Sequence, residues 1–277
     1  MIRSFLYVPG DRPSMLAKAP TRGADMLILD LEDAVAPSAK VGARLTILEA
    51  IPELEAGGAR FCVRVNSEHD EQEADLAALS GAGIETLVIP KATSQAIENV
   101  TDRCKRMGFP SVDLVALIES ARGLWEVLSI AGHPRVTGLA IGEEDLSADL
   151  GVDYRGDSML WHPVRSRLVW AAASAGLPGP TGPVSTDIAD LEGLRESTLL
   201  LRQCGFASRA AIHPTQVPII NEVLTPSEEE LEAARQLVDQ YDQALAQGKG
   251  AITDSQGNMI DEAVVRRARH LVLSRGG

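Results

Sequence analysis

The chain has 277 residues, of which 45% are apolar and 23% are charged, an ordinary composition for a globular protein. Its 39 acidic and 26 basic side chains give a formal net charge of −13. Proteins that bind nucleic acids need a basic surface to contact phosphates, so this balance excludes that class. No apolar run is long enough to span a bilayer, and the N-terminal residues lack the pattern of a secretory signal. We therefore expect no membrane partner and a cytoplasmic location.

Short apolar runs rich in β-forming residues alternate with longer runs of helical periodicity. Eight strands are expected, and the seventh has the weakest pattern. Their ranges are Ser4–Val8, Met26–Leu31, Arg60–Val65, Thr86–Pro90, Asp113–Ile118, Gly138–Ile141, Gly179–Val184 and Ala210–His213. The helices expected between them are Pro13–Arg22, Ser38–Ile51, Glu71–Ser80, Ser94–Met107, Ala121–Ala131, Met159–Ala175 and Ile188–Cys204.

Alternating strands and helices of this number predict an α/β fold of the (β/α)8 TIM-barrel type. The alternative is a doubly wound sheet, which carries a glycine-rich turn after its first strand. This chain has Val8-Pro9-Gly10-Asp11-Arg12-Pro13 at that place, without the glycine pattern. We assign residues 1–224 to a TIM-barrel catalytic domain.

The pattern changes in residues 225–277. A long charged helix is expected at Ser227–Leu245, then a loop or hairpin at residues 248–258, then a helix at Asp261–Ser274. A segment added to a finished barrel either covers one of its ends or packs on another subunit. We interpret this one as a helix-loop-helix extension that packs on a neighbouring subunit.

Carboxylates follow several of the expected strands, at the face of a barrel where active sites form. Asp30-Leu31-Glu32-Asp33 ends the second strand, Glu119 the fifth and Gly142-Glu143-Glu144-Asp145 the sixth. Close like charges raise one another's pKa, and a divalent cation relieves this. Because no His or Cys cluster accompanies the acids, Mg²⁺ is expected, with Mn²⁺ as the alternative ion.

Individual roles follow from these positions. Glu119 and Asp145 are the expected metal ligands, and Glu32 and Asp33 would hold metal-bound waters. The competing interpretation is that these acids are solvated loop residues of an acidic protein.

Two basic residues stand on the same rim. Arg64 ends the third strand and can grip a substrate carboxylate with two parallel hydrogen bonds; a salt bridge to Glu32 or Asp33 is the alternative. Lys91 ends the fourth strand and can bind substrate in the same way, act as a Schiff-base lysine, or serve as a charge partner for the acids. A neighbourhood of carboxylates keeps a lysine charged, which argues against the Schiff base.

The motifs at these positions resemble those of the HpcH/HpaI aldolase/citrate lyase family, in its citrate lyase β-subunit-like branch with malyl-CoA and citramalyl-CoA lyases. They occur in the family's order over nearly the full length. The matching segments are residues 3–13 (RSFLYVPGDRP), 29–35 (LDLEDAV), 63–66 (VRVN), 89–91 (IPK), 117–120 (LIES), 142–146 (GEEDL), 212–216 (IHPTQ) and 258–261 (NMID).

The resemblance implies Mg²⁺ bound through Glu119 and Asp145, a substrate carboxylate held by Arg64, and coenzyme A thioesters as substrates. It also implies that Asp261 reaches the active site of a neighbouring subunit and acts there as the acid/base. The corresponding assembly would be a homotrimer or a hexamer built of trimers.

The implied activity is a Mg²⁺-dependent carbon–carbon lyase that cleaves a 3-hydroxy-3-carboxylate acyl-CoA to a 2-keto acid and an acyl-CoA. Two alternatives stay open: a citrate lyase β subunit that acts on a citryl thioester of an acyl-carrier protein, and a malyl-CoA-type thioesterase. The chain departs from the family at Ser208-Arg209-Ala210-Ala211, where Gly-Lys-Ser is expected before the His-Pro, and at Val184-Ser185-Thr186-Asp187, where a Tyr is common before the Asp. These departures leave the carrier of the thioester undecided.

Overall fold

The computed structural model describes residues 1–109, 111–152, 159, 161–253 and 257–273. The predicted helix end at Ser274 and parts of the predicted segments at 159–175 and 248–258 lie outside these residues. The chain forms two compact units, Ile2–Leu224 and Thr225–Gly277. Among the described helices, none has the length and apolar character that crossing a bilayer needs.

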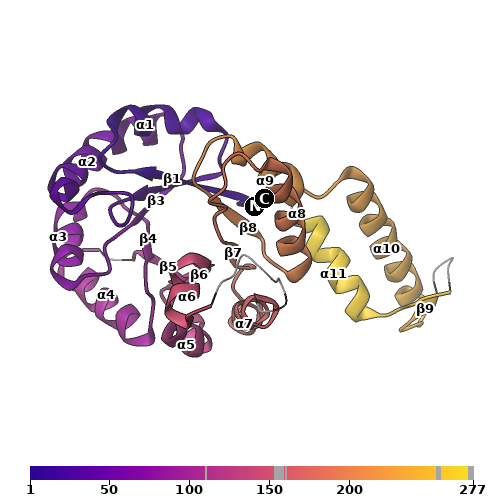
Figure 1. The fold of residues 1–277 in the computed structure, drawn as a ribbon. Helices are drawn as coiled ribbons and strands as arrows, with labels where there is room; N and C mark the ends of the chain where they lie inside the picture. Colours follow the sequence, from indigo (N-terminus) through magenta and orange to yellow (C-terminus); the bar gives the residue numbers. More distant parts are fainter. Residues whose placement is uncertain (110, 153–158, 160, 254–256, 274–277) are drawn as a thin grey trace. The chain divides into compact units, whose positions relative to one another are not determined.

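Ile2–Leu224 contains a closed barrel of eight parallel strands that follow one another in sequence order (Figure 1), which confirms the predicted fold. The strands are β1 (Ser4–Pro9), β2 (Met26–Asp30), β3 (Phe61–Arg64), β4 (Thr86–Ile89), β5 (Asp113–Ile118), β6 (Val136–Ile141), β7 (Thr181–Gly182) and β8 (Ser208–Ala211). The seventh strand, which has the weakest sequence pattern, is also the shortest of the eight barrel strands.

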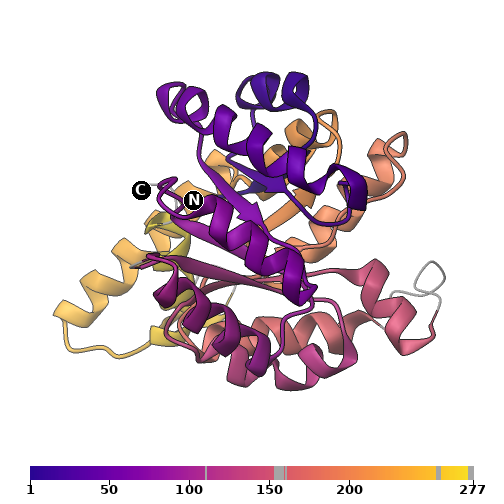
Figure 2. The same ribbon diagram turned by 90° about the vertical axis from the view of Figure 1, so that its left-hand side faces the viewer.

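Helices alternate with the strands and lie outside them (Figure 2). They are α1 (Pro13–Lys18), η1 (Ala19–Arg22), η2 (Pro37–Ala39), α2 (Lys40–Ala56), α3 (His69–Leu79), α4 (Ser94–Arg106), α5 (Ala121–Ala131), α6 (Glu143–Leu150), α7 (Trp161–Ser174), α8 (Leu191–Cys204) and α9 (Gln216–Leu224). The helix predicted at Ala121–Ala131 has those bounds, because the Ser120 hydroxyl caps it by accepting from the Gly123 amide at 3.0 Å.

Two helical features differ from the sequence prediction. α2 does not stop at Ile51 but continues through Pro52, since Leu54 beyond the proline is 2% exposed and its burial holds the last turn. α6 (Glu143–Leu150) begins directly after β6, where no helix was predicted. Its first turn carries Glu143, Glu144 and Asp145, and negative charge there is favoured by the helix dipole.

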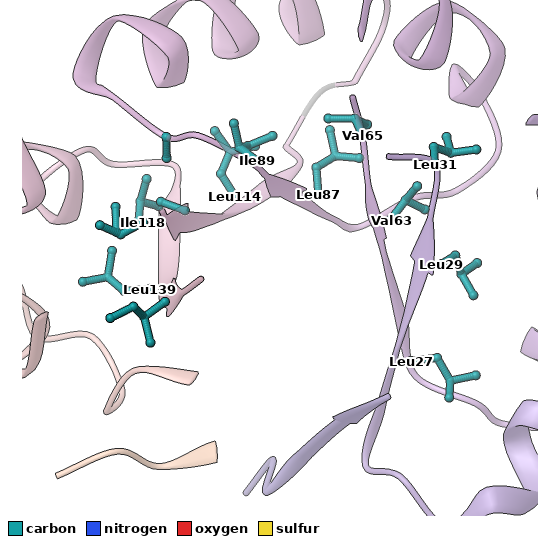
Figure 3. Packing of buried hydrophobic residues seen from close by; sticks show 14 of the residues in the cluster. Leu27, Leu29, Leu31, Val63, Val65, Leu87, Ile89, Leu114, Ile118 and Leu139 are labelled. Carbon is teal, nitrogen blue, oxygen red and sulfur yellow. The ribbon is translucent and has the colours of Figure 1, made fainter. Parts of the chain in front are cut away.

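The main hydrophobic core lies between the strands and their surrounding helices. Alternate residues on the strands, or directly after them, point outward into it. Figure 3 labels Leu27, Leu29, Leu31, Val63, Val65, Leu87, Ile89, Leu114, Ile118 and Leu139. A second, smaller cluster fills the barrel interior, with Phe5, Met26, Ile28, Cys62, Val88 and Leu117. The residues of this inner face are the ones that approach the barrel mouth.

Thr225–Gly277 contains α10 (Glu228–Ala246), a two-stranded antiparallel sheet of β9 (Ile252–Thr253) and β10 (Met259–Ile260), and α11 (Glu262–Leu273). α10 begins with a capping box in which Ser227 and Glu230 each bond the other's backbone amide. Tyr241, Ile260 and Val265 form a small apolar cluster of their own.

Candidate active site

A cavity of about 380 Å³ opens at the C-terminal ends of the strands. Four of the predicted site residues, Asp33, Arg64, Glu119 and Asp145, line it together. Its wall also includes Tyr7, Asp30, Gly142, Glu143 and Ile212 at the rim, with apolar residues below. The structure therefore brings the acids of β2, β5 and β6 and the arginine of β3 to one mouth.

Asp30 holds Arg64 in a two-bond pair within this wall. Arg64 donates from Nε to Asp30 Oδ1 and from Nη2 to Asp30 Oδ2, both at 2.7 Å. Asp30 is fully buried and also accepts from the Glu32 and Ala34 amides. One long edge of the guanidinium is thus fixed to β2, which orients the rest of it.

The other end of Arg64 meets two more acids and an aromatic ring. Its Nη1 lies 3.1 Å from Glu32 Oε2 and 3.2 Å from Asp33 Oδ2, and its Cζ stands 4.9 Å from the centroid of the Tyr7 ring. Burial works against the charge, but hydrogen bonds to Asp30 outweigh it and raise the arginine's pKa above its ordinary value. The Asp33 side chain is 65% exposed, so it can yield the Nη1 position to an incoming carboxylate.

Glu119 is 4% exposed and faces the cavity. Its Oε1 accepts the Lys91 backbone amide at 2.7 Å. Burial, with Glu32 and Asp145 nearby, raises its pKa to about 8. Gly142 makes room for it, because a Cβ at that position would lie 2.7 Å from Glu119 Oε2.

Glu32 is almost as deeply buried, at 5% exposed. Among the described residues neither of its carboxylate oxygens accepts a hydrogen bond of good geometry, and its charge partner is Arg64. Burial is the main reason that its pKa is raised to about 7, and the neighbouring Asp33 adds to the effect.

Asp145 stands in the first turn of α6, exposed at the cavity mouth. Two residues earlier, Glu143 is buried and makes a two-bond pair with Arg165 of α7, at 2.6 and 2.8 Å. The charge of Glu143 is therefore compensated by Arg165, whereas the Asp145 carboxylate lies at the open rim of the cavity.

Lys91 contributes through its backbone. Its φ of 46° is in the left-handed region, unusual for a residue other than glycine, and this conformation aims its amide at Glu119. The Lys91 side chain is exposed and does not line the cavity.

These features fit a divalent cation. Glu119 and Glu32 are buried carboxyls with raised pKa values, and Asp145 lies at the same cavity. Arg64 is already hydrogen-bonded to Asp30. No three His, Cys, Asp or Glu side chains of the described residues gather into one metal cluster. A site of Glu119 and Asp145 alone would rely on water or substrate oxygens to complete its coordination, as Mg²⁺ sites commonly do.

Asp261 belongs to the C-terminal unit and precedes α11. Its Oδ1 accepts the backbone amides of Ala263 at 3.0 Å and Val264 at 3.1 Å, the arrangement of a helix N-cap. The acid/base role predicted for it remains a prediction.

Three participants escaped the sequence analysis: Asp30 as the holder of Arg64, Tyr7 as the ring beneath it, and the Glu143–Arg165 pair. Strict alternation along β1 and β2 carries the signal for the first two, because Tyr7 follows the inward-facing Phe5 by two residues and Asp30 follows the inward-facing Ile28 by two. The third depends on a helix, α6, that was not predicted.

Residues 3–214 match the family described as HpcH/HpaI aldolase/citrate lyase. The chain belongs to this family. A (3S)-malyl-CoA thioesterase of Cereibacter sphaeroides is 35% identical over 96% of this chain and 92% of its own length. An L-malyl-CoA/β-methylmalyl-CoA lyase of the same organism is 33% identical over 98% of this chain and 93% of its own.

A solved structure of a relative has the same fold. Protein CitE of Mycobacterium tuberculosis, crystallised with magnesium, acetoacetate and coenzyme A, superposes with a TM-score of 0.83 at 31% identity. The match covers 99% of this chain and 98% of that one. The similarity to these relatives therefore extends over the C-terminal unit's sequence as well as the barrel.

Proposed function

We propose that this protein is a Mg²⁺-dependent carbon–carbon lyase that cleaves a 3-hydroxy-3-carboxylate acyl-CoA, of the citramalyl-CoA or malyl-CoA type, into a 2-keto acid and an acyl-CoA. The observation that carries the proposal is the buried Glu119, beside Glu32 and opposite Arg64, at the mouth of the cavity. Carboxylates in this position would hold a divalent cation, and the cation would stabilise the negative charge that develops on a substrate oxygen.

The reaction is a retro-Claisen cleavage. The substrate hydroxyl gives its proton to solvent water at the cavity mouth and becomes the keto group, the carbon–carbon bond breaks, and its electron pair passes to the α-carbon of the thioester. That carbon then takes a proton and leaves as the acyl-CoA. When bound, the metal ion supplies a Lewis acid for the hydroxyl and carboxylate oxygens.

The chain's own groups divide this work. Glu119 and Asp145 hold the cation, and Glu32 and Asp33 support it. Arg64, fixed by Asp30, donates to the substrate carboxylate from Nη1, where the exposed Asp33 gives way. The Lys91 amide orients Glu119, and its exposed ammonium offers a positive charge at the rim to an anionic substrate.

The proton at the α-carbon is assigned to Asp261. We propose that residues 225–277 pack on a neighbouring subunit and deliver Asp261 to that subunit's barrel. Head-to-tail donation of this kind closes into a ring, most simply a trimer, or a hexamer of two such rings. A cytoplasmic location, where acyl-CoA thioesters are made and used, goes with this role.

A second candidate is a malyl-CoA-type thioesterase, favoured by the 35% identity to the (3S)-malyl-CoA thioesterase. It would use the same residues to bind substrate but release free coenzyme A. A subunit that requires an acyl-carrier protein is the third.

One assay separates the three. The purified chain is incubated alone with Mg²⁺ and with citramalyl-CoA, malyl-CoA or citryl-CoA, and keto acid, acyl-CoA and free thiol are all quantified. A lyase yields keto acid and acyl-CoA in equal amounts without free thiol. Free thiol without keto acid would identify the thioesterase, and no turnover until a carrier protein is added would identify the subunit.

A further inference from the structure

The proposed lyases differ in the substituent on the keto acid that they release. Malyl-CoA gives glyoxylate, which carries hydrogen; citramalyl-CoA gives pyruvate, which carries methyl; citryl-CoA gives oxaloacetate, which carries a charged carboxymethyl group. The depth and polarity of the cavity beside Glu119 determine which of these substituents can bind there.

The barrel interior is asymmetric below its carboxylates. β1, β2 and β5 send large side chains inward, such as Phe5 and Leu117, and β3 and β4 send Cys62 and Val88. β6, β7 and β8 contribute Ala140, Thr181 and Ala210 instead, and all three line the cavity. In the barrel Ala140 pairs with Thr181, and Ala210 pairs with Phe5.

This lower part of the cavity offers little to a polar group. The Thr181 hydroxyl already shares a hydrogen bond with the Ser208 hydroxyl, with 2.8 Å between Thr181 Oγ1 and Ser208 Oγ. The remaining lining is aliphatic or aromatic, and we call it the apolar chamber: Phe5, Ile28, Val88, Val115, Leu117, Ala140 and Ala210.

The apolar chamber adjoins the proposed cation site directly. Glu119 follows Leu117 by two residues on the fifth strand's inner face, and Gly142 follows Ala140 by two on the sixth. Glu119 is 4% exposed, and within the part of the chain described here nothing donates a hydrogen bond to its Oε2. A keto acid held at this carboxylate through a cation would have Ala140 next to it.

We propose that the apolar chamber receives an alkyl substituent of the keto acid, so that the preferred substrates release alkyl 2-keto acids, pyruvate or longer, rather than glyoxylate or oxaloacetate. This rests on the proposed lyase function. Each methylene buried in an apolar site is worth about fourfold in affinity. An ionised carboxymethyl group would lose its water there without gaining a partner.

The test is calorimetric binding of glyoxylate (corrected for its hydrated fraction), pyruvate, 2-oxobutyrate and oxaloacetate to the full-length chain with saturating Mg²⁺. We expect affinity to rise about fourfold from pyruvate to 2-oxobutyrate. Oxaloacetate should bind at least about tenfold more weakly than 2-oxobutyrate. Glyoxylate or oxaloacetate binding as tightly as 2-oxobutyrate would overturn the proposal.

Substitutions in the apolar chamber test whether it is the site that determines the affinity for the alkyl keto acid. Ala140→Val should reduce 2-oxobutyrate affinity about tenfold by overfilling the space, and should change glyoxylate affinity less than about twofold. Ala210→Val, on another strand, provides a second test if the first variant folds poorly by circular dichroism. Thr137→Val adds the same side chain at an exposed position of β6 and should change neither affinity. Unchanged 2-oxobutyrate binding in both folded chamber variants would contradict the assignment.

The proposed function fails in a different way. If no keto acid binds with Mg²⁺ and none of the three thioesters is cleaved, both the lyase function and the chamber's role are wrong. If keto acids bind and thioesters are cleaved without an alkyl preference, only the role of the chamber is wrong.

Discussion

Arg64 is useful to a substrate only because one of its edges is already occupied. Asp30 takes Nε and one Nη2 proton, so a substrate carboxylate can bind at the second Nη2 proton and at Nη1, where it replaces the exposed Asp33. Lysine has no planar fork and cannot satisfy Asp30 and a substrate together. Arg64→Lys should therefore lose about 2–4 kcal/mol of transition-state binding, about 30- to 1000-fold in kcat/KM.

The matched control is Arg195→Lys, because Arg195 also makes a two-bond carboxylate pair, with Glu222, but at an exposed place outside the cavity. It should leave kcat/KM unchanged. Near-normal kcat/KM in Arg64→Lys would show that the arginine does not hold substrate.

Glu119 links pH to stability in the metal-free protein. Its pKa is about 8 in the folded chain, against an ordinary value of 4.5, mainly because it is buried. The folded state keeps a proton that the unfolded chain has lost, so the free energy of unfolding should fall as pH rises from about 5 to about 8. Thermal melts in EDTA at several pH values measure this.

Glu119→Gln should reduce that slope substantially and leave the part due to Glu32, whose pKa is also raised, whereas Glu49→Gln, an exposed change outside the site, should keep the full slope. A slope that is the same in all three proteins would mean that Glu119 ionises in the folded chain as it does in water.

At the level of elements, the turn from β6 into α6 determines where Glu119 can lie. A methyl group on Gly142 would come 2.7 Å from Glu119 Oε2 and 2.9 Å from its Cβ, so Gly142→Ala must push the carboxylate aside. Overpacking of this kind costs about 1–3 kcal/mol. We expect Mg²⁺ affinity, measured by calorimetry, to fall about tenfold or more.

Gly42→Ala is the control for this substitution. Gly42 lies in α2 and an added Cβ would meet nothing within 4 Å, so alanine there should stabilise the fold slightly and leave Mg²⁺ binding intact. If Gly142→Ala bound Mg²⁺ as well as Gly42→Ala does, the turn would not position the site.

The strands and helices were predictable from the sequence, but the ion pairs between them were not. The alternation of strands and helices predicted the barrel, and placing acids at strand ends predicted the rim, because both follow from local pattern and from the barrel's known polarity. The Asp30–Arg64 pair joins residues 34 positions apart, and the Glu143–Arg165 pair joins residues 22 apart. Such pairings depend on the register between neighbouring strands and helices, which local periodicity does not determine.

For the whole molecule, the proposal that Asp261 works across subunits can be tested by mixing inactive variants. Asp261→Asn keeps the N-cap of α11, since asparagine caps as well as aspartate, but removes the acid/base. It should lose most activity. Mixed with Asp145→Ala subunits, it should recover part of that activity, because some barrels then receive both intact residues.

Asp239→Ala, an exposed change in α10 of the same C-terminal unit, should stay active and serves as the control. No recovery in a mixture whose subunits are shown to exchange, or full activity in an isolated monomer, would contradict donation between subunits.

The central claim is that the acids at the barrel mouth hold the divalent cation on which cleavage depends. Crystals of the protein grown with Mn²⁺, measured at a wavelength where manganese scatters anomalously, test it most directly. We expect one strong anomalous peak between the Glu119 and Asp145 carboxylates, absent in crystals of the Asp145→Ala variant. A peak at another site, or none at saturating Mn²⁺, would contradict it.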